Sequence, residues 1–94
     1  MVLDLDTLEN IVKTVFSNMR SRGIREITLD SDFYWDIPTE LLYDPYNEPK
    51  ELNIGQLEED YDVLKQSSQK NILVGHNLKN ISVLLRYISM KHPL

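Results

Sequence analysis

The chain has 94 residues, 15 acidic and 10 basic side chains, a net charge of −5 and no cysteine. A chain of this length is predicted to form one compact domain, residues 1–94, and the lack of cysteine excludes disulfides, thiolate metal sites and a cysteine nucleophile. The net negative charge argues against nucleic acid and anionic membrane as partners, because both attract lysine and arginine.

The N-terminal residues do not have the pattern of a secretion signal. Residues 1–6 lack a basic region followed by a long apolar run, which a signal peptide needs. No stretch approaches the roughly 18 apolar residues that cross a bilayer. The predicted compartment is therefore the cytoplasm.

A helix is predicted over about residues 5–22, because apolar residues recur there at steps of three and four. Asp6, followed three residues later by Glu9, is typical of an N-terminal cap with its return partner. Gly23 is typical of a helix end. The apolar face comprises Leu5, Leu8, Ile11, Val12, Val15, Phe16 and Met19.

Extended structure is predicted after Ile24, since apolar and polar residues alternate with period two. Ile27 and Leu29 form one such set. After a short break at residues 30–32, Phe33, Trp35 and Ile37 form another. In one interpretation the side chains of this second set point into the core, and Tyr34 and Asp36 face water.

The middle of the chain is predicted to be a helical turn, a loop and a short extended segment. Pro38 ends the strand and is favourable at the start of a turn over 38–43. Residues 44–49 form a loop held by Pro45 and Pro49. Leu52 and Ile54 are expected in a brief extended segment.

Two further helices are predicted in the last forty residues. One opens at Gly55 and directs Leu57, Tyr61 and Leu64 inward, and residues 67–69 break it. The other runs from about Lys70 to Ser89. Its main apolar face comprises Val74, Leu78, Ile81, Leu84, Leu85 and Ile88.

The last helix carries a second stripe away from that face, so it is either sandwiched in a small core or presents a contact surface. The stripe comprises His76, Asn80, Val83 and Tyr87, with Lys79, Arg86 and Met90 beside it. As a contact surface for a homodimer, the expected residues are His76, Lys79, Val83, Arg86 and Tyr87. The expected fold is α+β: an N-terminal helix, two or three short antiparallel strands, and two C-terminal helices packed on one face of the sheet.

Signatures of enzymes and cofactor sites are missing from the sequence. Asp30 and Asp32 begin like a calcium loop but lack its later ligands, so we interpret them as turn residues that bond nearby amides. His76 and His92 have no metal-ligand spacing, and the three glycines are too far apart for a phosphate loop. We predict no enzyme activity, metal or cofactor, although a His76–carboxylate pair in a deep pocket would be the sign of an enzyme. The acids Glu58, Glu59 and Asp60 suit the first turn of a helix.

Charge is strongly segregated along the chain. Twelve of the fifteen acids lie between Glu26 and Asp62 together with a single basic residue, Lys50, so this segment carries −11. Residues 63–94 carry +5 and no acid, and the acidic segment holds the only Trp and four of the five Tyr. The two poles either pair within one fold or meet partners of opposite charge.

Acids interleaved with tyrosines suit a partner with a basic surface, through cation–π contacts and charge-assisted hydrogen bonds. The first hypothesis is a non-enzymatic binder that caps such a partner, for example the active cleft of a nuclease toxin. The alternative is a self-associating accessory subunit, in which the basic C-terminal helix of one copy meets the acidic segment of another. The predicted partner-binding residues are Tyr34, Asp36, Tyr43, Asp44, Tyr46 and Glu48.

Part of the acidic segment resembles a family of small uncharacterised bacterial proteins. The shared pattern is Tyr-Trp-x-Ile-Pro from Tyr34, Leu-Tyr-x-Pro-Tyr from Leu42 and Gly-Gln-Leu from Gly55. It covers about residues 33–64, a third of the chain. The resemblance implies a compact α+β domain of bacterial type and brings no chemistry with it. In size, acidity and lack of motif the chain is also similar, more loosely, to immunity proteins that neutralise bacterial toxins.

Overall fold

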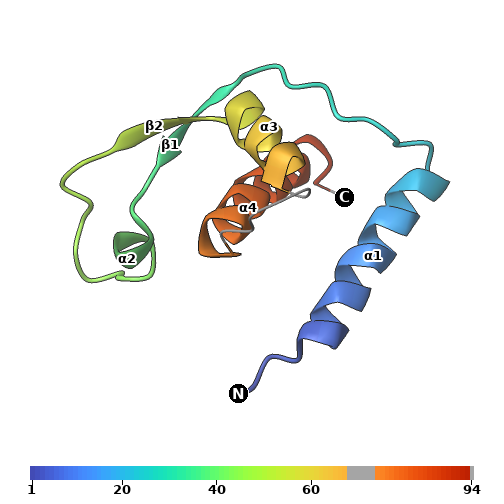
Figure 1. Ribbon diagram of the computed structural model, residues 1–94, viewed down its shortest axis with the longest axis horizontal. Coiled ribbons are helices and arrows are strands. Elements are labelled where there is room, and N and C mark those ends of the chain that lie inside the picture. Colours follow the sequence, from blue (N-terminus) through green and yellow to red (C-terminus); the bar gives the residue numbers. More distant parts are fainter. Residues whose placement is uncertain (68–73, 94) are drawn as a thin grey trace.

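The computed structural model describes residues 1–67 and 74–93 and confirms the predicted α+β class. An N-terminal helix is followed by two antiparallel strands and by a pair of C-terminal helices that pack on each other (Figure 1). A single helical turn lies between the strands, and the second strand passes directly into the next helix. In chain order the elements are α1 (Leu5–Ser21), β1 (Phe33–Asp36), α2 (Thr39–Leu42), β2 (Asn53–Gln56), α3 (Leu57–Ser67) and α4 (Val74–Lys91).

Helix α1 forms where its apolar period predicts, but a different residue caps it. The Asp4 carboxylate accepts hydrogen bonds from the Thr7 hydroxyl and from the Thr7 backbone N–H, the latter at 3.0 Å. These bonds lower the pKa of the Asp4 carboxyl below its ordinary value. The predicted cap of Asp6 with Glu9 is therefore wrong, and Glu9 instead pairs with Lys13 at 2.8 Å. The last helical residue is Ser21 and the C-cap is Arg22, and Gly23 directly after them acts as the predicted stop, with a φ of 85° that glycine adopts without strain.

Helix α1 stands apart from the other elements (Figure 1). None of its residues is buried, so the apolar face that we expected to enter the core is largely in solvent. Residues 24–29 form no strand, against the prediction from Ile27 and Leu29. This segment makes no strand pairing with the sheet, and α1, which precedes it, lies away from the sheet. The radius of gyration is 15.0 Å, compared with about 12 Å for a compact chain of this length.

The two-stranded sheet is defined by a close contact between an aromatic ring and a glycine. Tyr34 lies opposite Gly55, and a Cβ atom at Gly55 would lie 2.2 Å from the Tyr34 ring. Only glycine lets the ring pack across the neighbouring strand in this way. The face with Tyr34 and Asp36 is consequently turned inward, while Phe33 and Trp35 are 68% and 65% exposed. The interpretation that placed Phe33 and Trp35 in the core is wrong.

Asp32 joins the segment before β1 to the start of α3. Its backbone oxygen accepts from the Leu57 N–H at 2.8 Å, and its carboxylate accepts from the Glu58 N–H and the Gln56 side-chain amide, both at 2.7 Å. Asp32 therefore satisfies backbone donors at the N-terminus of a helix that begins 25 residues later in the chain. The expectation that this carboxylate would bond nearby amides does not hold.

Replacing Asp32 with alanine is expected to lower the free energy of unfolding by about 1–2 kcal/mol, because the first turn of α3 loses its capping carboxylate. Asp32→Asn keeps an oxygen acceptor and removes the charge, so a smaller loss is expected. Urea unfolding followed by circular dichroism measures both. Equal losses for the two variants would show that the charge, and not the acceptor, makes the contribution.

The helices α3 and α4 pack on each other and contain the buried residues of the described part of the chain. Among the described residues only Leu57, Tyr87 and Asn80 are buried. Helix α4 extends to Lys91, past the predicted end at Ser89. Of the predicted break at residues 67–69, Ser67 is still the last residue of α3, and the other two residues lie outside the described residues, as does the predicted helix start at Lys70. No helix in the described part of the chain is long and apolar enough to cross a membrane.

Candidate functional site

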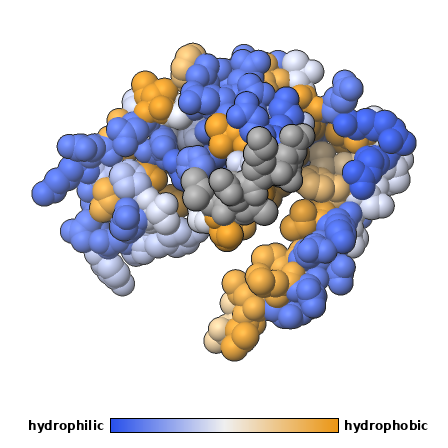
Figure 2. Space-filling view, in the orientation of Figure 1, coloured by the Kyte–Doolittle hydropathy of each residue, from blue (hydrophilic) through white to orange (hydrophobic). Residues whose placement is uncertain are grey.

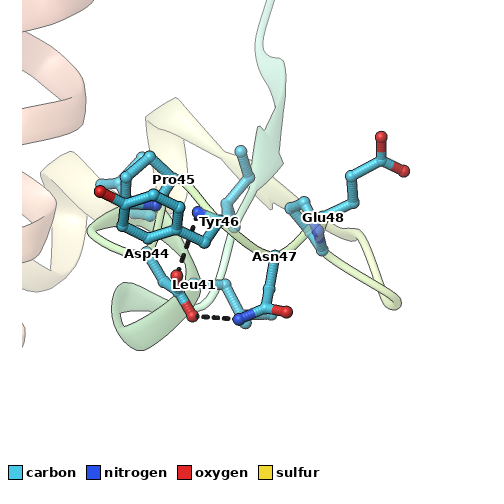
Figure 3. A pocket seen from close by; sticks show the side chains of 9 residues that line it. Leu41, Asp44, Pro45, Tyr46, Asn47 and Glu48 are labelled. Atoms are coloured by element: carbon cyan, nitrogen blue, oxygen red, sulfur yellow. Dashed lines mark hydrogen bonds between the residues drawn. The ribbon is translucent and has the colours of Figure 1, made fainter.

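The loop after α2, residues 43–49, presents two tyrosines to solvent and is called the tyrosine loop below. Tyr43 is 80% exposed and Tyr46 is 92% exposed. The loop itself is held by Asp44, whose carboxylate accepts from the Tyr46 N–H at 3.2 Å and from the Asn47 side-chain amide at 2.8 Å (Figure 3). Asp44 therefore links positions 46 and 47 of the loop, while both tyrosine rings remain exposed.

A shallow pocket of about 470 Å³ lies between this loop and α2. Leu41 and Pro45 supply apolar lining and Asp44 supplies a carboxylate. Glu48 belongs to the same rim and extends away from the other labelled residues (Figure 3). Three predicted partner-binding residues, Asp44, Tyr46 and Glu48, thus line one pocket, while Tyr43 at the start of the same loop lines a larger groove between β1 and α4.

The other two predicted partner-binding residues face inward. The Tyr34 hydroxyl donates to the Asp60 carboxylate at 2.5 Å, and the Lys79 Nζ lies 2.8 Å from the Asp36 carboxylate. Burial raises the pKa of the Tyr34 hydroxyl well above its usual range, and the bond to Asp60 raises it further. Tyr34 and Asp36 therefore connect β1 to the helices, and they do not share the surface of the tyrosine loop.

The acidic and basic poles of the chain meet within one fold. Lys79 and Lys91 on α4 pair with Asp36 and Asp30 from the acidic segment. In the described part of the chain, by contrast, no cation pairs with Glu40, Glu48 or Glu51. The internal pairs neutralise Asp30 and Asp36 near α4, and part of the negative charge that remains unpaired among the described residues lies in and beside the tyrosine loop.

The second stripe of α4 divides between interior and surface. Asn80 is 1% exposed and its Nδ2 lies 3.3 Å from the His76 Nε2, while Tyr87 is buried and accepts a hydrogen bond from the Asp30 N–H at 2.9 Å. His76 and Arg86 are exposed, and Val83 is half-buried. Four of the five predicted contact residues, Lys79, Val83, Arg86 and Tyr87, nevertheless line one groove, and only His76 lies outside it.

A larger groove between β1 and α4 was not predicted from the sequence. Its volume is about 940 Å³, and exposed side chains from both elements line it: Phe33 and Trp35 from β1, Leu78 and Met90 from α4. Alternation correctly placed Phe33 and Trp35 on one face, but it carries no information on whether that face is covered. The apolar residues on both sides of the α4 helix were the available signal.

Among residues 1–67 and 74–93 no group of three or more His, Cys, Asp and Glu side chains could hold a metal ion. The partner of His76 is the Asn80 amide, and no carboxylate bonds to this imidazole in the described part of the chain.

Comparison of the chain with models of known families, with curated proteins and with solved structures finds no match in any of the three. The resemblance of residues 33–64 to small bacterial proteins stays a prediction.

Proposed function

We propose that this chain is a non-enzymatic protein-binding domain whose loop at residues 43–49, the tyrosine loop, binds a basic surface of another protein. The observation that supports it is the exposure of Tyr43 and Tyr46 on a loop that Asp44 holds in place. Exposed tyrosines on an ordered loop lose little conformational entropy on binding and bring a large contact area. They are therefore well suited to be anchors of an interface.

The charge around the loop indicates the chemistry of the partner. Glu48 lies in the loop and Glu40 and Glu51 flank it in the sequence, and none of the three has a cation of its own among the described residues. An arginine or lysine of the partner can stack on a tyrosine ring and also pair with one of these carboxylates. Such complementarity speeds association and disfavours acidic partners. An inhibitor of the immunity type, which covers a basic cleft, fits this chemistry.

The partner would be isolated by affinity capture from an extract of the native host, with washes at low and high salt. Titration calorimetry with the purified partner then tests the loop. The double variant Tyr43→Ala, Tyr46→Ala is expected to weaken binding by at least about thirtyfold, since aromatic anchors of interfaces contribute 2 kcal/mol or more. The affinity of the wild-type chain should fall as salt is raised.

Two matched variants separate the loop from the rest of the acidic segment. Tyr61→Ala removes an exposed tyrosine whose ring already has the Lys65 Nζ 4.8 Å from its centroid, and it should leave affinity unchanged. Glu48→Gln should weaken binding, whereas Glu59→Gln on α3 should not. Full affinity in the double tyrosine variant, or equal losses at positions 48 and 59, would contradict the proposal.

A further inference from the structure

The chain exposes far more surface than a compact monomer of its size. Its accessible surface is 8319 Å², whereas a folded monomer of 11.0 kDa exposes about 5,600 Å². The excess is about 2,700 Å². A stable protein–protein interface buries about 800 Å² on each partner. The excess exposed surface is thus large enough for an extensive interface in addition to the one proposed for the tyrosine loop.

One part of this surface is the apolar side of α1, which is called the ridge below. Four of the seven residues on the apolar side of α1 are exposed and the other three are half-buried. Figure 2 shows apolar residues gathered along one side of α1 with polar residues along the other. A helix with this pattern normally buries its apolar stripe against another element. Its most exposed members are Leu5, Leu8, Ile11 and Val15.

The other part is the groove between β1 and α4. Phe33, Trp35, Leu78 and Met90 are each more than 60% exposed there. Helix α4 has 18 residues and α1 has 17, which correspond to lengths of about 27 and 25 Å. A helix of the length of α1 can therefore lie along the whole groove.

We propose that two copies of this chain form a dimer by exchanging α1, each helix lying in the β1–α4 groove of the other copy. The segment after α1 projects the helix away from the rest of its own chain (Figure 1). Each copy offers one ridge and one groove, so a two-fold exchange covers both and closes at two copies. This association goes beyond the proposed function. Of the tyrosine-loop residues, Tyr43 also lines the groove, whereas Asp44, Tyr46 and Glu48 line the separate pocket beside α2.

Charge indicates the direction of the exchanged helix. The start of α1 carries Asp4, Asp6 and Glu9, and the groove wall carries Arg86, whose guanidinium has no partner among the described residues. An antiparallel arrangement of α1 on α4 brings these acids to the C-terminal half of α4, where Arg86 lies. It also opposes the dipoles of the two helices.

The first test is the mass of the full-length chain by light scattering at about 1–100 μM. A wild-type mass of twice 11.0 kDa is expected. Ile11→Glu places a charge on the apolar stripe and should give a monomer, whereas Asn10→Glu adds the same charge on the opposite side of α1 and should leave the dimer intact. Far-UV circular dichroism confirms that both variants keep their helices. A wild-type monomer at the highest concentration, a larger assembly, or a dimer insensitive to Ile11→Glu overturns the proposal.

Trp35 supplies a second test, because it is the only tryptophan and it lines the groove. On dilution of the wild type, its emission should move to longer wavelength as the dimer dissociates and the ring is uncovered. Emission at short wavelength in a monomer, unchanged on dilution, would show that α1 covers its own groove and would overturn exchange. Both tests use the chain alone, so their failure is distinct from failure of the tyrosine loop to bind a partner.

Discussion

Leu57→Ala is expected to lower the free energy of unfolding by about 2–5 kcal/mol, the range for removing a buried leucine side chain. Leu57 is 3% exposed at the point where β2 passes into α3. Its N–H also donates to the Asp32 backbone oxygen at 2.8 Å. Because so few of the described side chains are buried, a single cavity here removes a large share of the apolar burial. For a small domain this loss is comparable with the whole stability.

Leu52→Ala is the matched control, since Leu52 is a leucine that precedes β2 and is 49% exposed. Its expected change is within about 0.5 kcal/mol. Both variants would be measured by urea unfolding at one fixed protein concentration, because the proposed dimerisation would make stability depend on concentration. Similar losses at the two positions would mean that Leu57 is not the centre of the core.

The kinds of element could largely be predicted from local signals. The apolar period of α1, the helix end at Gly23 and the turn after Pro38 depend only on neighbouring residues, and the structure confirms each. Local signals are sufficient here because helix periodicity and the conformational limits of glycine and proline act within a few residues.

The contacts between elements could not be predicted, because they depend on residues far apart in the chain. Phe33 and Trp35 are more apolar than Tyr34, so apolar burial alone places them in the core. The strand turns the other way because Tyr34 meets Gly55 across the ladder and Asp60 on α3. A sequence without known pairing gives no register, and a change of one residue in register exchanges the two faces.

The candidate site was predicted in part for the same reason. Asp44, Tyr46 and Glu48 are close in sequence, and the loop that contains them brings them to one pocket. Asp36 was grouped with them on the basis of charge, yet Lys79 lies 43 residues further along the chain and pairs with it. Counting charges along a chain reveals the two poles, but only the fold decides which charges neutralise each other.

Tyr87→Ala is expected to lower the free energy of unfolding by about 3–5 kcal/mol, the range for deleting a buried aromatic ring. Tyr87 is 8% exposed, and its hydroxyl accepts from the Asp30 N–H at 2.9 Å. The Lys91 Nζ also lies 5.9 Å from the centre of the ring. The side chain therefore both packs in the core and links the segment before β1 to α4 through this hydrogen bond.

Tyr87→Phe separates these two roles, because it keeps the ring and removes only the hydroxyl. An expected loss of about 1 kcal/mol corresponds to the single hydrogen bond to Asp30. Urea unfolding of both variants gives the packing contribution as the difference between them. If Tyr87→Phe lowered the free energy of unfolding as much as Tyr87→Ala, the hydrogen bond and not the packed ring would hold the segment at Asp30 against α4. The anchor at Asp30 would then be the feature that fixes where the segment bearing α1 leaves the rest of the fold.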